Sequence, residues 1–264
     1  MKRRRLDKAL VERNLARSRS HARQLIDNDR ILIRGFPASK ASTLVEHNDH
    51  IEIKGDEYRW VGRGGKKIWP IFEEEQWDVE DSVALDVGAS TGGFTQALLR
   101  AGATLIHAVD VGYGQLADSL RQDERVIVHD RYNFRHAKSK DFTPVPSIFV
   151  MDVSFISTIK LLDGLNRVMT SDAEGWVMVK PQFEAGPSEN EEGIIKDSKT
   201  IQRVLNEVRD AWEKNDWGAQ QILPAGLTGQ EGNQEFFLKM DRQSPVELQS
   251  DTINKVVKEV FEAN

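Results

Sequence analysis

A turn of glycines and small hydroxyl residues interrupts an apolar run in the segment ALDVGASTGG. Turns of this kind bind nucleotides in α/β proteins, because glycine lets the backbone approach the ligand closely. A dinucleotide turn carries glycine at its first, third and sixth positions, whereas here the glycines are Gly88, Gly92 and Gly93. A phosphate-binding loop ends in Gly-Lys-Ser or Gly-Lys-Thr, but Phe94 and Thr95 follow here. The turn therefore fits neither a hydride carrier nor a triphosphate well.

Two carboxylates, one just before this turn and one at the end of the next predicted strand, indicate which ligand it binds. We expect Asp86, two positions before the first glycine, to point into the ligand crevice, where it would repel a pyrophosphate and attract an ammonium or sulfonium group. Asp110 follows about 20 residues after the turn, where an acidic residue binds ribose hydroxyls. S-adenosylmethionine, which carries a cationic sulfur and no phosphate, is the favoured cofactor. The alternative is that both carboxylates only cap helices.

The predicted cofactor-binding residues gather at the ends of successive strands. Asp130 and Asn133 are expected beside the adenine. The full predicted set is Asp86, Gly88, Ser90, Gly92, Gly93, Phe94, Asp110, Asp130, Asn133 and Asp152.

The absence of certain residues and motifs from the chain excludes some classes of methyl acceptor. It contains no cysteine, and methylation of a pyrimidine at carbon 5 needs a cysteine nucleophile. Methylation of an exocyclic amine usually accompanies an Asn-Pro-Pro-aromatic turn, and the corresponding segment reads MDVSF. A ribose hydroxyl is the best remaining acceptor. Lys180 ends an apolar strand, with Asp152 expected as its neighbour, and could help this weak acid to lose its proton.

The elements that position these residues alternate from residue 82 onward. Strand-like runs separated by helical patterns predict a Rossmann-like class I methyltransferase fold, a mostly parallel doubly wound sheet. The last two strands, GAQQILPA and NQEFFLKM, have no helix between them and should pair antiparallel at a sheet edge. Helices are expected over residues 92–102, 114–123, 158–169 and 199–215, and in the C-terminal segment DTINKVVKEVFEAN.

The N-terminal part predicts a small α+β domain with a different partner. Residues 1–67 hold 17 Lys or Arg against 9 Asp or Glu, and the remainder holds 19 against 33. Segregated positive charge suits a polyphosphate, although a solvated basic face is the alternative. Two short helices are expected, the second capped by Ser18 or Ser20, followed by strands in RILIRG and HIEIKG. The predicted RNA-binding residues are Arg4, Arg5, Arg17, Arg19, Arg23, Arg63 and Lys66, with Arg30 and Arg34 also on exposed turns.

These patterns divide the chain into an RNA-binding domain at 1–60, an interdomain linker at 61–81 and a methyltransferase domain at 82–264. The linker is expected from its glycines and from Pro70. No segment approaches the roughly 18 apolar residues of a membrane span, and no signal peptide is visible. A cytoplasmic protein with no membrane partner and no bound metal is expected; the sequence indicates no oligomeric state.

The first domain resembles the small RNA-binding domain shared by a small-subunit ribosomal protein, several pseudouridine synthases and tyrosyl-tRNA synthetase. The resemblance lies in RLDKALVERNLARSRSHARQLIDNDRILIRG and in Lys40. It implies RNA binding. Asp29 stands at a turn position where that family usually has glycine, which predicts a different bend of the backbone there.

Almost the whole chain resembles the TlyA (haemolysin A) family of rRNA methyltransferases. The motifs are, in order, SRSHARQLI, VGRGGKK, LDVGASTGGFTQALL, AVDVGYGQL, LRQDERV, MDVSFIS, VKPQFEAG and EGNQEF. The resemblance implies 2′-O-methylation of cytidine in ribosomal RNA, or in ribosomal subunits, by S-adenosylmethionine. Relatives often carry glutamate in place of Asp130.

The catalytic domain also resembles FtsJ-type ribose methyltransferases, whose Lys-Asp-Lys-Glu tetrad falls on Lys67, Asp152, Lys180 and Glu235. The family's Arg-Gly-Gly-any-Lys pattern selects Lys67 over Lys66. The resemblance implies that Lys180 polarises or deprotonates the hydroxyl, that Asp152 holds it, and that the other two complete the network. Surface ion pairs are the alternative for each lysine. The alternatives for the whole protein are a non-catalytic ribosome-assembly factor and a membrane-active haemolysin.

Overall fold

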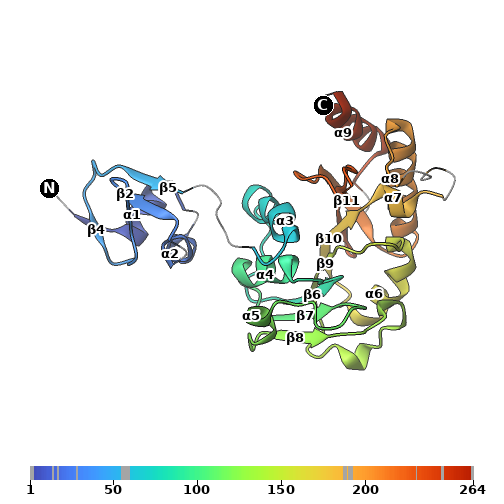
Figure 1. Cartoon of the computed structure of the whole chain (residues 1–264), viewed down its shortest axis with the longest axis horizontal. Coiled ribbons are helices and arrows are strands. Elements are labelled where there is room, and N and C mark those ends of the chain that lie inside the picture. The colour runs from blue at the N-terminus through green and yellow to red at the C-terminus, as the bar shows by residue number, and fades with distance from the viewer. Residues whose placement is uncertain are drawn as a thin grey trace. The chain divides into compact units, whose positions relative to one another are not determined.

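The chain folds into two compact units, residues 1–59 and 60–264 (Figure 1). The computed structural model describes residues 3–13, 15–16, 18–27, 29–54, 60–186, 189, 193–229, 231–244 and 247–262. Each unit has its own apolar core. Because the second unit begins at Trp60, the segment predicted as a linker lies within it.

The first unit is a small α+β fold. Its elements are β1 (Arg4–Arg5), α1 (Leu6–Glu12), α2 (Arg19–Asp27), β2 (Ile31–Ile33), β3 (Phe36–Pro37), β4 (Leu44–Val45) and β5 (Ile51–Ile53). Strand β1 pairs with β4, and the other three form a sheet in the order β3-β2-β5. The helices bury Leu6, Leu10 and Leu25 against these strands. Ser18 Oγ accepts a hydrogen bond from His21 N at 3.1 Å, so Ser18, rather than Ser20, caps α2.

The turn between α2 and β2 contains Asp29. Its backbone has φ = 55°, in the left-handed region that glycine adopts most readily and that aspartate tolerates. The residue that stands in the place of the family's glycine thus takes up a backbone conformation that glycine would also allow.

The second unit is built on a seven-stranded sheet. Its strands are β6 (Val83–Val87), β7 (Leu105–Val109), β8 (Val126–His129), β9 (Ile148–Met151), β10 (Glu174–Val179), β11 (Gly218–Pro224) and β12 (Phe236–Asp241). Their order is β11-β12-β10-β9-β6-β7-β8. Strands β6 to β10 pair in parallel, and β12 runs antiparallel to both β10 and β11. The predicted fold class and the antiparallel pairing at one edge are confirmed.

Helices cover both faces of this sheet. They are α3 (Arg63–Glu74), α4 (Gly93–Ala101), α5 (Asp118–Arg121), α6 (Leu162–Val168), α7 (Pro181–Glu184), α8 (Ser198–Glu213) and α9 (Ser250–Glu262), with short 3₁₀ turns η1 (Phe134–His136), η2 (Ser139–Asp141) and η3 (Thr158–Leu161). Figure 1 shows α3, α4 and α5 on one face and α6, α8 and α9 on the other. The helix predicted over 114–123 is shorter than expected, and the one predicted from 158 begins as a 3₁₀ turn.

Most of the segment predicted as a linker is instead helix α3. This helix packs along α4 and buries Ile68, Trp69 and Phe72. The glycines at its start and Pro70 within it are helix breakers by type, but the apolar face that follows them has helical spacing. Burial of that face favours the helix despite Pro70.

A hydrogen-bonded pair of histidines, buried His107 and half-buried His129, links β7 to β8. His107 Nε2 lies 3.0 Å from the carbonyl oxygen of Pro144, which can only accept, so this nitrogen carries the proton. His107 Nδ1 then accepts a hydrogen bond from His129 Nε2 at 3.1 Å. Burial lowers the pKa of His107, and burial together with the neighbouring His107 lowers the pKa of His129 to about 4. Both rings are therefore neutral in the folded protein near pH 7.

Acidification should destabilise the fold through this pair. The unfolded chain binds protons at these rings near pH 6.5, whereas folded His129 binds one only near pH 4. Stability is therefore lost as the pH falls from 6.5 toward 4. We expect the free energy of unfolding to drop by about 1–2 kcal/mol more in the wild type than in His129→Gln, which has no titrating ring at that position. Urea unfolding at pH 7 and pH 4.5 measures both losses, and equal losses would contradict this role.

Candidate active site

Two lysine–carboxylate pairs lie at the carboxyl edge of the second unit's sheet. Lys180 Nζ lies 2.7 Å from Asp152 Oδ1 and donates a hydrogen bond to Ser154 Oγ at 2.9 Å. Lys67 Nζ donates to Glu235 Oε2 at 2.5 Å. The four residues predicted as a tetrad thus form two ion pairs, and both pairs line one pocket.

The sheet topology explains this arrangement. Asp152 and Lys180 directly follow the neighbouring parallel strands β9 and β10. Glu235 directly precedes β12, whose first residue, Phe236, pairs with Val179 of β10 in the antiparallel register. Glu235 therefore enters the edge where Lys180 leaves it. Lys67 comes from α3, the helix that the sequence did not predict.

The pairs are largely shielded from water. The exposed fractions of the side chains are 9% for Lys67, 4% for Glu235, 10% for Lys180 and 22% for Asp152. Opposite charges attract more strongly in such a place than at the surface, but a charge left alone there is costly. Each carboxylate thereby keeps its lysine in a fixed position at the pocket wall.

Two adjoining pockets open at this edge. The first, of about 460 Å³, contains the tetrad together with Arg63, Ser154 and Phe183. The second, of about 370 Å³, lies toward β7 and β8. The two share the lining residues Gly88, Ser90, Asp152, Ser154 and Phe155. A molecule filling the second pocket would therefore meet one filling the first beside Asp152.

The glycine turn shapes the boundary between the pockets. Gly88 has φ = +89°, and a Cβ atom there would lie 2.3 Å from the carbonyl oxygen of Asp152. Only glycine fits this position. Asp110 Oδ2 accepts a hydrogen bond from Ser90 N at 2.8 Å, and its Oδ1 accepts one from Gly112 N at 2.7 Å. These two bonds fix the Asp110 carboxylate at the wall of the second pocket.

Asp86 lies behind the turn, contrary to our expectation that it points into the crevice. It is fully buried, it lines neither pocket, and its Oδ2 accepts a hydrogen bond from Thr95 Oγ1 at 2.6 Å. Its Oδ1 has no hydrogen-bond partner within the described ranges. Burial raises the pKa of Asp86 to about 7, and the charge of Asp152 adds to this rise. The carboxyl group therefore lies outside both pockets, but its charge can still interact with their acidic lining residues.

The other predicted cofactor-binding residues divide into two groups. Gly88, Ser90, Gly93, Phe94, Asp110, Asn133 and Asp152 line one or both pockets. Gly92 and Asp130 line neither. Gly92 has φ = +96° and begins α4, which is a structural role. Asp130 is engaged by Arg121 at 2.9 Å, which holds its carboxylate in an ion pair.

Phe155 is a site residue that the sequence reasoning did not identify. Its side chain is 90% exposed, yet it lies at the mouth of both pockets and packs against Phe183 with ring centroids 5.0 Å apart. Its φ of 63° is uncommon for a large side chain and directs the backbone through a tight bend. The motif MDVSF contains both Phe155 and Ser154, but the sequence reasoning used it only to discriminate among acceptors and to recognise the family.

In the first unit, one buried carboxylate gathers three arginines. Asp7 is fully buried; its Oδ1 lies 3.1 Å from Arg5 Nε, and its Oδ2 lies 2.8 Å from Arg19 Nη2 and 3.8 Å from Arg23 Nε. Hydrogen bonds from Arg5 and Arg19 hold the pKa of Asp7 far below its usual range. The guanidinium groups remain about half exposed. Asp7 thus fixes a cluster of cations whose remaining N–H groups face solvent.

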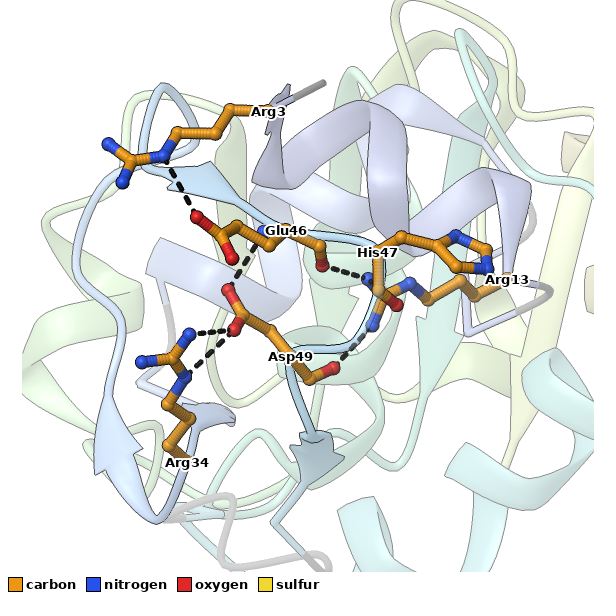
Figure 2. Close-up of polar contacts among 6 residues, drawn as sticks. All are labelled: Arg3, Arg13, Arg34, Glu46, His47 and Asp49. Carbon is orange, nitrogen blue, oxygen red and sulfur yellow. Dashed lines mark hydrogen bonds and ion pairs between the residues drawn. The ribbon is translucent and has the colours of Figure 1, made fainter. Parts of the chain in front are cut away.

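A second carboxylate, Asp49, organises the loop between β4 and β5 (Figure 2). It accepts hydrogen bonds from Arg34 and from Glu46 N. Arg13 donates to the carbonyl oxygens of Asp49, Glu46 and His47, and Arg3 reaches Glu46 at 3.2 Å. Hydrogen bonds from Glu46 N and Arg34 lower the pKa of Asp49. Arg34 is therefore anchored to the fold at one end of its guanidinium group.

The remaining cations predicted to bind RNA have varied surroundings. Arg4 pairs with Glu12. Arg63 lines the tetrad pocket and donates to the carbonyl oxygen of Thr228 at 3.0 Å, while Lys66 is exposed outside both pockets. Arg17 lies outside the described residues.

Neither a membrane span nor a metal cluster occurs in the described parts of the chain. No helix in them is long and apolar enough to cross a membrane. No group of three or more His, Asp or Glu side chains in them could hold a metal ion.

Residues 60–242 match the FtsJ-like methyltransferase family, and residues 4–51 match the S4 domain. The chain is 38% identical to YqxC from Bacillus subtilis, a proposed rRNA methyltransferase, with 98% of this chain and 94% of that one covered. It is 36% identical to the 16S/23S rRNA (cytidine-2′-O)-methyltransferase TlyA from Mycobacterium tuberculosis, with 98% of each chain covered. The structure of a proposed hemolysin from Streptococcus thermophilus aligns with a TM-score of 0.75 at 33% identity, covering 99% of this chain and 97% of that one.

Removal of one partner from the buried pair of Lys67 and Glu235 should destabilise the second unit. Glu235→Gln would leave the Lys67 ammonium buried without its counter-charge, and we expect the free energy of unfolding to fall by about 3 kcal/mol. Denaturant unfolding at pH 7 measures the loss. The control is Glu262→Gln, which breaks an exposed pair with Lys258 and should change stability by less than about 0.5 kcal/mol. Equal stability of the two variants would refute the prediction.

Proposed function

The chain belongs to the TlyA family of FtsJ-like methyltransferases, and from that premise we propose that it transfers a methyl group from S-adenosylmethionine to the ribose 2′-hydroxyl of cytidine in ribosomal RNA. One observation carries the proposal. The two pairs, Lys180 with Asp152 and Lys67 with Glu235, converge on a pocket that adjoins a second pocket across the glycine turn. Acceptor and methyl donor would occupy the two pockets and meet beside Asp152.

The chemistry of the second pocket suits S-adenosylmethionine better than a phosphate-bearing coenzyme. None of its lining residues is Lys, Arg or His, whereas Asp110 and Asp152 are acidic. Such a wall repels a pyrophosphate and favours a cation. Asp110 would bind the ribose hydroxyls, and Phe134, Ile156 and Leu161 supply apolar surface for the adenine. When bound, the cofactor supplies an electrophilic methyl group on a cationic sulfur.

Lys180 is proposed to act directly on the 2′-hydroxyl. The amine donates a hydrogen bond to Ser154 and forms an ion pair with Asp152, and a remaining N–H can hold the 2′-oxygen in place. Lys180 polarises the hydroxyl or, after releasing one of its own protons, accepts the hydroxyl proton as the oxygen attacks. Lys67 and Glu235 fix the opposite wall, so that much of the rate would come from alignment.

Two features are suited to a nucleic acid substrate. The exposed ring of Phe155 at the pocket mouth offers a face on which the base next to the reacting ribose can stack. The first unit presents Arg5, Arg19 and Arg23 around Asp7, and guanidinium groups bind phosphate oxygens. We propose that this unit anchors the ribosomal RNA.

Loss of the Lys180 amine should abolish transfer without loss of the fold. For Lys180→Ala we expect methyl transfer at least about 100-fold slower, because a positioned acid or base contributes that much or more. Affinity for S-adenosylmethionine, measured by calorimetry, should stay within about threefold of the wild type. The assay follows radioactive methyl incorporation into rRNA transcripts and maps 2′-O-methylation by resistance to alkaline hydrolysis.

The matched control is Lys239→Ala, which removes a lysine that pairs with Glu174 on the same sheet but lies outside both pockets. It should retain full turnover. Wild-type turnover in Lys180→Ala would refute the assignment of Lys180. Wild-type protein that methylates only base positions would refute the proposed function itself.

Substitution of Asp7 can distinguish two explanations of RNA binding by the first unit, the position of its arginines and its net charge. The two predict opposite changes in RNA affinity. If arginine position matters, Asp7→Asn should weaken binding of rRNA transcripts about threefold to tenfold, although it removes a negative charge. If net charge alone matters, the same variant should bind more tightly. Filter binding at 0.1 M salt decides the sign, and thermal unfolding monitors the fold. Asp27→Asn, which removes an exposed carboxylate from α2, should bind at least as well as the wild type.

A further inference from the structure

The second unit carries an open hollow lined by cations, away from the residues of the tetrad. Its volume is about 830 Å³. We call it the basic basin and define it by the lining residues Arg135, Lys138, Lys140, Lys160 and Arg167. His136 also lines it, and among the described residues Asp163 is the only acidic one in the lining.

The lysines of the basin are not neutralised by the protein. Within the parts of the chain that the structure describes, Lys138, Lys140 and Lys160 form no ion pair. The arginines instead shape the rim. Arg167 donates to the carbonyl oxygens of Ala137 at 2.9 Å and Arg135 at 2.7 Å, which fixes the backbone that carries the basin. Lys138 and Lys140 follow the backbone that Arg167 holds, Lys160 belongs to a separate 3₁₀ turn, and all three side chains are exposed.

This cluster contrasts with the charge of the chain around it. Residues 68–264 hold 19 Lys or Arg against 33 Asp or Glu, so cations are in the minority there. Five cations around one carboxylate repel one another, and an anionic partner relieves that repulsion. In the first unit, by contrast, Asp7 and Asp49 are buried among their arginines. The positive charge of the basin is therefore suited to binding an anion from outside the chain.

The basin and the proposed cofactor pocket share no lining residue, but neighbouring residues of the chain line the two. Phe134 and Leu161 line that pocket, while their chain neighbours Arg135 and Lys160 line the basin. Both neighbours belong to the short turns η1 and η3, which come after β8 and β9, on the side of the sheet where the tetrad lies. A long anion in the basin would thus be held by the same unit that carries the reacting groups.

We propose that the basic basin binds the phosphate backbone of the RNA substrate, as a contact separate from that of the first unit. The inference rests on the proposed function. The hollow is wide and open, and its lysines are flexible point charges that form no ion pair with any residue the structure describes. This arrangement suits a chain of repeated phosphates better than a single small anion. Binding there would orient the RNA relative to the tetrad and would not alter the chemical step.

The test neutralises the three lysines together in the full-length protein. We expect Lys138→Gln/Lys140→Gln/Lys160→Gln to bind protein-free 23S or 16S rRNA transcript about tenfold more weakly at 0.1 M salt. The slope of the logarithm of the binding constant against the logarithm of the salt concentration should become shallower by about one to three. This is roughly one for each phosphate that the variant leaves without a cation. The control, Lys214→Gln/Lys255→Gln/Lys258→Gln, removes the same charge from positions on or next to α8 and α9 and should bind within about twofold of the wild type.

Failure of the inference and failure of the proposed function give different results. If the wild type methylates ribose and the two triple variants bind rRNA equally well, the basin does not bind RNA. The same conclusion follows if the basin variant loses affinity only for assembled subunits, since its partner would then be an acidic protein surface. If the wild type transfers no methyl group to ribose but the basin variant still loses rRNA affinity, the proposed function fails and the basin remains an RNA contact. Calorimetry with S-adenosylmethionine should show unchanged affinity in the basin variant, and a large loss would indicate damage to the proposed cofactor pocket instead.

A positional probe supplies a second readout that does not depend on affinity. Because the chain has no cysteine, Lys140→Cys creates a unique attachment site for an iron chelate that cleaves nearby RNA. We expect cleavage at a few discrete rRNA positions with this variant and only background with Lys258→Cys. Equal cleavage patterns from the two variants would overturn the proposal.

Discussion

The candidate active site depends on one constraint, the antiparallel placement of β12 beside β10. In a purely parallel sheet, residues that precede a strand lie at the edge opposite to those that follow one. The reversal of β12 brings Glu235, at the start of a strand, to the edge where Asp152 and Lys180 end theirs. Lys67 then completes the set because α3 packs along α4, whose first turn borders the same pocket. Two buried ion pairs follow from that topology, and each holds a lysine that would otherwise be free to move into solvent.

Much of the fold could be predicted from the sequence because its signals are local. Apolar runs that contain Asp86 or lead up to Asp110 and Asp152 indicated strands, and the missing helix before β12 indicated the antiparallel edge. Helix α3 escaped because glycines and Pro70 are strong local breakers, whereas the burial that stabilises the helix comes from distant residues. The sequence also did not predict the direction in which the Asp86 side chain points. Strand β6 is buried on both faces, so the pattern of apolar residues carries no information about which face a side chain takes.

The candidate site residues came mainly from ordered motifs, and the structure adds contacts that no motif contains. Residue type alone could not show that Asp130 is engaged by Arg121, or that Phe155 stands in solvent at the mouth of both pockets. The same holds for the distribution of charge. The sequence showed a basic N-terminal part and an acidic remainder, but only the folded chain shows that arginines of the former surround buried carboxylates, whereas lysines of the latter gather without one.

Asp86, buried behind the glycine turn, is a group near the proposed cofactor pocket whose charge can change within the range of cellular pH. With a pKa of about 7, this carboxyl group is divided between its neutral and ionised forms near neutrality. A cation above it favours the ionised form, and an uncharged product favours the neutral one. If the cofactor is the sulfonium compound proposed, Asp86 would give up a proton as the cofactor binds and regain one after transfer. Because of this proton exchange, the Asp86 carboxylate would not remain buried as a negative charge once the cofactor has lost its positive charge.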